Sequence, residues 1–250
     1  MIVPLKSVNI TARVETGLTH TQVDLTYSNR LSEETIDVEF AYPMVNDQVV
    51  QSFSAQIGNR TVVGTVKNKR EARVEYRRGK AAGKGVIYAE QNEYLKLKLG
   101  NLQAGQDALI TIKLVESATE LIGGAYSYRV PSKYFPRYKI KGEKQGDYDP
   151  NSYTFQYKVD LAAPEGKMIN YVSSPSSSNH AEQVGRRLVT IDVPPTESPP
   201  AKDIHIYYKT TDMMLTPNMF IERDPEYPEQ VAVGATFAPS FDQRDNDGFL

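Results

Sequence analysis

The sequence predicts an all-β protein, built as an antiparallel β-sandwich or a pair of sandwiches, with one short basic helix packed on a sheet. Apolar and polar residues alternate with a period of two over most of the chain. Turn residues separate the alternating runs, and the sequence lacks the long apolar runs typical of a parallel sheet covered by helices. Each sheet is therefore expected to turn one apolar face to the core and one polar face to water.

Nine alternating runs are expected to be strands: residues 23–27, 36–40, 95–99, 110–114, 126–130, 153–161, 189–193, 204–208 and 231–237. Turns between strands are expected at Asn29-Arg30, Gly58-Asn59, Gly123-Gly124 and Glu165-Gly166. The proline-rich run at residues 194–200 is either a stiff linker between domains or a loop between two strands. Because strand patterns flank it closely on both sides, we favour the loop.

One segment, residues 67–80, departs from the alternation and is rich in Lys, Arg, Glu and Ala, which favour helix. Ala72 and Tyr76 lie one helical turn apart and form only a narrow apolar stripe. We therefore expect a helix lying on a sheet and not one buried in the core. Glycines at positions 79, 83 and 85 are expected to end it before a strand that begins near Val86.

The basic segment, residues 67–84, concentrates positive charge. Its eight cations are Lys67, Lys69, Arg70, Arg73, Arg77, Arg78, Lys80 and Lys84. With two acids its net charge is +6, so the rest of the chain carries −8 against a total of −2. This surface favours a protein partner with an acidic surface, although a solvated helix without a partner explains it as well. Nucleic acid is not expected, because Tyr76 is the lone aromatic residue in the segment.

Composition narrows the function classes. The chain has 250 residues and no cysteine, which excludes disulfides, thiolate metal sites and thiol nucleophiles within it. No apolar run has the length of a signal peptide core or a membrane span. We expect a soluble, cytoplasmic protein, or an extracellular one if the chain is a fragment of a secreted parent; the oligomeric state is not readable from the sequence.

Catalytic patterns are missing from the sequence. Of the three histidines, His20 and His180 are expected in turns and His205 on the outer face of a strand, all exposed to solvent. There is no nucleophile elbow, no His-Glu-x-x-His pair and no phosphate-binding glycine loop. We therefore predict no catalytic residue, no cofactor and no metal site, and a protein that is not an enzyme.

A set of motifs spread over the first 138 residues points to a family. In order they are Tyr42-Pro43, Ile57-Gly58, the Lys-rich helix with Ala72 and Tyr76, Gly100-Asn101-Leu102 with Gly105, and Arg129-Val130-Pro131. This order resembles the VIT (vault and inter-alpha-trypsin-inhibitor) domain, which is found beside von Willebrand type A domains. Physically, Gly58 and Gly105 suit turns that need positive φ, and Asn101 is expected to bond local backbone. Pro43 and Pro131 are expected to stop strands.

The resemblance implies a domain plan and a function. We expect a VIT-like β-sandwich at residues 1–140, a connecting antiparallel β region packed with it at 141–240, and a flexible tail at 241–250. The Asp-x-Ser-x-Ser signature of the type A domain's metal site is missing from this chain. The favoured function is a non-enzymatic interaction or scaffold module of a larger protein; the alternatives are a carbohydrate-binding β-sandwich and an accessory domain of an ADP-ribosyltransferase-type enzyme.

Overall fold

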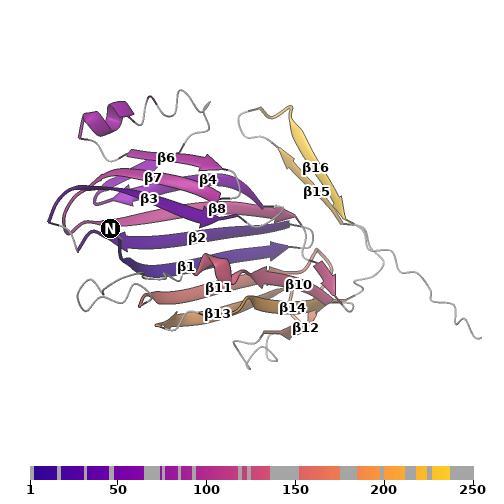
Figure 1. The fold of residues 1–250 in the computed structure, drawn as a ribbon. Helices are drawn as coiled ribbons and strands as arrows, with labels where there is room; N and C mark the ends of the chain where they lie inside the picture. Colours follow the sequence, from indigo (N-terminus) through magenta and orange to yellow (C-terminus); the bar gives the residue numbers. More distant parts are fainter. Residues whose placement is uncertain are drawn as a thin grey trace, which may run out of the picture.

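A computed structural model describes residues 3–15, 18–30, 33–44, 48–64, 74, 77–83, 86–91, 94–117, 120–122, 125–135, 152–174, 185–197, 200–211, 218–223 and 227–236. Sixteen strands dominate these residues (Figure 1). Their bounds are β1 (Leu5–Glu15), β2 (Leu18–Ser28), β3 (Ile36–Pro43), β4 (Gln48–Ile57), β5 (Arg60–Val63), β6 (Val86–Gln91), β7 (Tyr94–Leu102), β8 (Asp107–Ser117), β9 (Glu120–Ile122), β10 (Ala125–Val130), β11 (Thr154–Ala162), β12 (Ile169–Ser173), β13 (Leu188–Thr196), β14 (Ile204–Thr210), β15 (Asn218–Arg223) and β16 (Val231–Thr236). A 3-10 helix, η1 (Ser132–Tyr134), follows β10.

The strands form four sheets. A seven-stranded sheet has the order β13-β11-β1-β2-β8-β4-β5, a four-stranded one β12-β14-β10-β9 and a three-stranded one β3-β7-β6. The strands β15 and β16 form a separate hairpin. Each of the nine alternating runs lies within a strand or extends beyond it by one residue at most, so the all-β prediction is confirmed. Alternation with a period of two predicted these strands correctly because most of them bury only one face.

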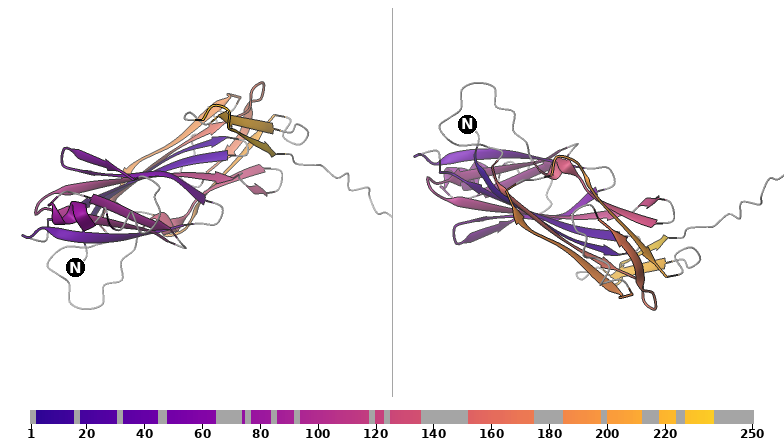
Figure 2. Two further views of the ribbon diagram at one scale, coloured as in Figure 1. Left: turned by 90° about the horizontal axis from the view of Figure 1, so that it is seen from above. Right: turned by 90° about the horizontal axis from the view of Figure 1, so that it is seen from below.

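The core lies on one face of the seven-stranded sheet. In β1, Val8, Ile10, Ala12 and Val14 are buried while the residues between them face outward, and β2, β8 and β11 show the same alternation. One continuous cluster joins these side chains to residues of both smaller sheets, such as Leu99 of β7 and Ile206 of β14. The three- and four-stranded sheets therefore cover the same face as the second layer of a sandwich (Figures 1 and 2).

Among the described strand pairs, β1–β11 alone is parallel, with Ser7 opposite Thr154 and Glu15 opposite Ala162. The prediction of purely antiparallel sheets is wrong at this pair. Period two cannot reveal it, because a strand with one polar face looks the same in either direction. A boundary near residue 140 would divide this continuous sheet; it stays a prediction.

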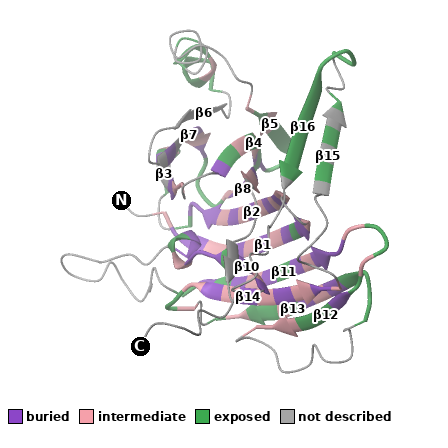
Figure 3. Ribbon diagram, turned by 90° about the vertical axis from the view of Figure 1, so that its right-hand side faces the viewer, coloured by how far each residue is buried: buried purple, intermediate pink, exposed green. Residues whose placement is uncertain are grey.

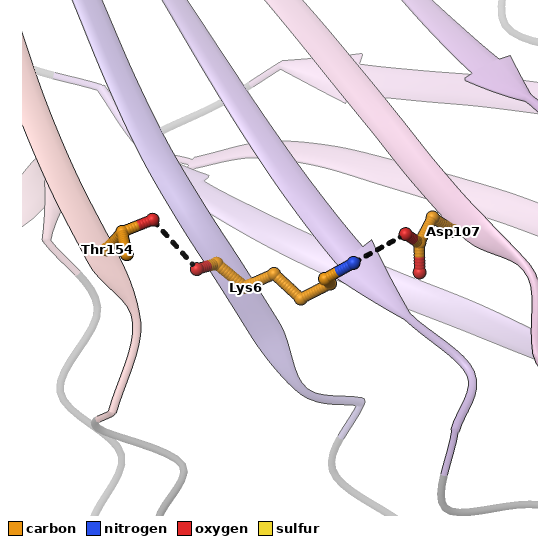
Figure 4. Close-up of polar contacts among 3 residues, drawn as sticks. All are labelled: Lys6, Asp107 and Thr154. Atoms are coloured by element: carbon orange, nitrogen blue, oxygen red, sulfur yellow. Dashed lines mark hydrogen bonds and ion pairs between the residues drawn. The ribbon is translucent and has the colours of Figure 1, made fainter. Parts of the chain in front are cut away.

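Polar contacts tie the strands together at the start of β1 (Figure 4). The Thr154 hydroxyl donates to the Lys6 carbonyl at 3.3 Å, and the Lys6 ammonium reaches across β2 to the Asp107 carboxylate at 2.6 Å. Partial burial would raise the pKa of Asp107, but the hydrogen bond and the positive charge of Lys6 outweigh it and lower that pKa. Residues from both halves of the chain are therefore joined at this end of the sheet.

The β15–β16 hairpin stands apart from the sandwich and exposes apolar side chains (Figure 3). Met219, Ile221, Val231 and Val233 are 66, 58, 44 and 62% exposed. Pairing of Met219 with Ala235 and of Ile221 with Val233 places them on one face. None of these residues belongs to the core cluster. The hairpin and the basic helix lie at opposite ends of the molecule (Figure 2).

The proline-rich run differs in part from its prediction as a loop. Pro194, Pro195 and Thr196 extend β13, an edge strand, and only the residues after them leave it. The register with β11 shifts there, passing from Tyr157–Val193 to Phe155–Thr196. Proline has no backbone N–H to donate to a neighbouring strand. It is tolerated here because a residue in a bulge of an edge strand does not need to make that hydrogen bond. The turn at Gly123-Gly124 and the tail at 241–250 lie outside the described residues.

Candidate functional site

The turns that carry the family motifs meet at one end of the sandwich. Gly58 lies between β4 and β5 with φ of +56°, and Gly105 lies between β7 and β8 with φ of +73°. Both predictions of positive φ are confirmed. A small pocket of about 110 Å³ lies between these turns and the end of the basic helix, and Ile57, Asn101 and Gln106 contribute to its wall. Ligand sites are typically about 300–1,000 Å³, so this pocket is too small for a substrate.

Asn101 holds the end of the basic helix. It is the one described non-glycine residue with positive φ, at +59°. Its side-chain amide donates to the Lys80 carbonyl at 3.2 Å, and its backbone N–H donates to Asp37 Oδ1 at 3.3 Å. The other oxygen of Asp37 forms an ion pair with the Lys80 ammonium. We call Asp37, Lys80 and Asn101 the helix latch.

The latch corrects the expectation that Asn101 bonds local backbone. Its partner Lys80 precedes it by 21 residues and lies in the last helical turn, where carbonyls lack partners within the helix. Asn tolerates the left-handed conformation better than other side chains, which explains why this residue suits the position. No local pattern marks Lys80 as the partner of Asn101, because the contact joins two separate elements.

The described part of the basic segment is helical and exposed. Val74 and residues 77–81 are helical, and Arg77, Arg78 and Lys80 are exposed to solvent. The side chains of Arg77 and Arg78 have no hydrogen bond or ion pair within the described residues. The other five predicted cations, Lys67, Lys69, Arg70, Arg73 and Lys84, lie outside the described residues, as do Ala72 and Tyr76.

Removing the Asn101 side chain is expected to loosen the latch. Asn101→Ala should lower the free energy of unfolding by about 2 kcal/mol, because it loses a hydrogen bond and because alanine tolerates positive φ less well than asparagine. Asn101→Gly should lower the free energy of unfolding by about 1 kcal/mol. Glycine also loses the hydrogen bond, but it adopts positive φ without strain. Urea unfolding of both variants measures the difference; equal costs would show that the conformation at this position contributes nothing.

The remaining motif residues have structural roles. Pro43 is the last residue of β3, and Pro131 separates β10 from η1. Leu102 is fully buried, and its carbonyl accepts a hydrogen bond from the buried Asn29 side chain at 3.0 Å. The same Asn29 amide donates to the Glu34 carbonyl at 3.0 Å. Asn29, which was predicted only as a turn residue, thus fixes the β2–β3 connection to the end of β7.

A buried polar cluster escaped the sequence analysis. Glu116 of β8 accepts a hydrogen bond from Thr21 at 3.4 Å, and the Thr21 hydroxyl lies 3.2 Å from that of Tyr128. Nearby, the Gln48 amide donates to the Tyr134 hydroxyl, and the Tyr134 ring stacks on Tyr42 with centroids 5.2 Å apart. These residues come from β2, β4, β8, β10, β3 and η1. Alternation predicts whether a residue faces the core or the solvent. It does not predict that polar side chains from several strands come into contact.

Burial raises the pKa of Glu116, although hydrogen bonds from Gln48 and Thr21 and the charge of Arg129 oppose the shift. The folded state therefore binds this proton more tightly than the unfolded state, so the contribution of Glu116 to stability falls as pH rises above the ordinary glutamate pKa of 4.5. Glu116→Gln should remove this decline. The difference in the free energy of unfolding between the variant and the native chain should therefore shift in favour of the variant as pH rises. Urea unfolding at several pH values between 4.5 and 7.5 checks this; an advantage that is independent of pH would contradict it.

Asp203 anchors η1. One carboxylate oxygen accepts from the Ser132 N–H at 2.8 Å and from the Ser132 hydroxyl at 2.6 Å, and these bonds lower the pKa of Asp203. Arg129 lies 3.6 Å from the other oxygen. Asp203 follows the proline-rich run and Ser132 follows β10, so this contact joins residues that are 71 positions apart.

The histidines do not form a site. His20 lies within β2 and is half-buried, so the predicted turn is wrong there. His205 lies on β14, half-buried and stacked on Tyr207, and not freely exposed as expected. His180 lies outside the described residues. Within the described part of the chain, no group of three or more His, Asp or Glu side chains is arranged to hold a metal ion.

Residues 5–114 match the family model described as the vault protein inter-alpha-trypsin domain. These residues are a VIT domain. The match contains the latch, Gly58, Gly105 and Leu102, while Arg129-Val130-Pro131 lies beyond it. In this VIT domain the motif residue Asn101 connects the end of the helix to the sandwich.

Relatives of the chain contain much more than a VIT domain. The human von Willebrand factor A domain-containing protein 5A is 28% identical over 149 residues, which cover 57% of this chain and 19% of that protein. The mouse protein mono-ADP-ribosyltransferase PARP4 is 33% identical over 115 residues, covering 45% of this chain and 6% of that enzyme. The chain thus matches less than a fifth of the length of these relatives.

A solved structure of an M1 zinc metallopeptidase from Deinococcus radiodurans aligns with 93% of this chain and 46% of its own, at a TM-score of 0.39 and 10% identity. A similarity this low supports no conclusion on fold or function. No helix in the described part of the VIT-domain chain is long and apolar enough to span a bilayer.

Proposed function

We propose that this chain is a non-enzymatic interaction module that uses its basic segment to bind an acidic protein surface. The observation that carries the proposal is the pair Arg77 and Arg78, exposed and without ion pairs in the described residues, beside a helix end that the latch fixes. A fixed cationic surface attracts an acidic partner and orients it. The VIT domain's occurrence in larger relatives supports an accessory role.

The proposal is tested by reversing charge on the helix. Replacing Arg70, Arg73, Arg77 and Arg78 by Glu should weaken capture of partners from a cell extract about tenfold or more, and raised salt should weaken capture by the native chain. The matched control reverses the exposed Lys133, Arg186, Lys202 and Arg223, which changes the net charge equally at other sites. If both variants lose the same partners, or neither does, the basic segment is not the binding surface.

An accessory role in a larger enzyme is a second candidate, favoured by the similarity to the mono-ADP-ribosyltransferase PARP4. A catalytic domain encoded with this chain would support it. Carbohydrate binding finds less support: Tyr42, Tyr128, Tyr134, Tyr157 and Tyr208 are among the buried tyrosines, and their rings are not available for stacking on sugars.

A further inference from the structure

The exposed face of the basic helix contains an apolar line as well as positive charge. Val74, Arg77, Arg78 and Ala81 are helical, and all four are exposed to solvent. Val74 is 41% exposed. Ala81 follows Val74 by seven positions, or almost two helical turns, so both residues lie on the same side of the helix. The line from Val74 to Ala81 is about 10 Å long.

The two arginines lie on opposite sides of this apolar line. At about 100° per residue, Arg77 is about 60° to one side of Val74 and Arg78 about 40° to the other. Neither guanidinium has a hydrogen bond or ion pair within the described residues. The basic segment keeps a net charge of +6 when its two acids, Glu71 and Glu75, are counted. Positive charge therefore borders the apolar line on both sides.

The other side of the helix faces the sandwich. Gly79 is half-buried between exposed neighbours, and it lies about 140° around the helix from Val74. The Lys80 carbonyl accepts the hydrogen bond from Asn101 of β7 at 3.2 Å. The helix lies beyond β6 at the rim of the molecule (Figure 1). The apolar line is therefore directed away from the sandwich and is accessible to a partner.

A helix suits this surface better than a strand does. Backbone groups inside a helix already bond to one another, so a partner strand would gain no main-chain hydrogen bonds here. Two helices pack through rows of side chains, and the small side chain of Ala81 allows a close approach. An unstructured acidic segment would pair with the arginines but leave the apolar line uncovered.

We propose that the acidic partner presents an amphipathic helix to this surface. The apolar stripe of the partner helix packs along Val74 and Ala81, and carboxylates on both sides of that stripe pair with Arg77 and Arg78. An apolar centre with a charged rim is the usual anatomy of a protein interface. The inference rests on the proposed function and specifies the chemistry of the partner.

The test titrates the full chain into labelled synthetic peptides and follows fluorescence anisotropy. One peptide is built from Glu and Leu, with Leu recurring every three or four positions; a second has the same composition with Leu shuffled off this period. The first peptide should bind about tenfold more tightly, because it alone offers an apolar stripe. Raised salt should weaken the binding of both peptides.

Val74→Ser should weaken binding of the first peptide about fivefold and leave the second unchanged, since only an apolar stripe covers the valine. Serine and valine have similar helix propensities, so circular dichroism should show the native helix content. The matched control, Val233→Ser, removes a valine that is 62% exposed on the distant β15–β16 hairpin and should change neither affinity. An effect of Val233→Ser equal to that of Val74→Ser would overturn the inference.

Replacing Arg77 and Arg78 by Gln separates this inference from the proposed function. Both peptides should bind this variant more weakly, because both are acidic. If they do, while Val74→Ser and the shuffled order change nothing, the helical partner is ruled out and the proposed function stands. If the arginine variant binds both peptides as well as the native chain does, the proposed function fails too. Tighter binding to vesicles of anionic lipid than to the first peptide would also contradict a helical protein partner.

Discussion

A chain cut after residue 140 is expected not to form a stable folded unit. The cut removes β11 and β13 from the large sheet and β12 and β14 from the four-stranded sheet. β1 would lose its parallel partner and expose an unpaired edge in what is now the interior of a sheet. The core would also lose fully buried side chains, among them Tyr157, Leu161, Ile191 and Tyr208.

The measurement is thermal unfolding of residues 1–140 beside the full chain. We expect a broad or missing transition for the short chain and aggregation through its exposed edge. The control is a chain cut after Thr211, which removes the β15–β16 hairpin. Since none of the hairpin side chains that the structure describes belongs to the core cluster, that chain should unfold within a few degrees of the full one. A cooperative transition of the 1–140 chain at the full chain's temperature would instead establish the boundary near residue 140.

Sequence patterns predicted the fold better than its connections. Alternation along β1, β2, β8 and β11 predicted which side chains face the core, because one face of each strand is buried in a single layer. The parallel pairing of β1 with β11 could not be predicted from the sequence pattern. The two strands are about 150 residues apart, and no local feature marks them as neighbours.

The same limit applies to the candidate site. Gly58 and Gly105 were predicted correctly because positive φ is a local property of a turn. Asn101 was misjudged, since its partner Lys80 belongs to another element. Thr21, Glu116 and Tyr128 alternate normally in their own strands, so their meeting depends on how two sheets pack.

Phe155→Ala is expected to lower the free energy of unfolding by about 3–5 kcal/mol, the usual cost of removing a buried aromatic ring. Phe155 is 2% exposed, and its ring meets Phe135 edge-on with centroids 4.4 Å apart and stacks on Tyr157 at 5.7 Å. Phe135 follows η1 and Phe155 lies in β11, so the lost Phe135–Phe155 contact joins two separate elements. Urea unfolding measures the cost.

The neighbouring residue provides the control for this substitution. Gln156 points to the polar face, and Gln156→Ala should change stability by about 0.5 kcal/mol or less. A slip of the β11 register by one residue would turn Phe155 to water and Gln156 to the core. The two variants would then show similar costs, or Gln156→Ala the larger one. A large cost at Phe155 beside a small one at Gln156 therefore tests which face of this strand is buried.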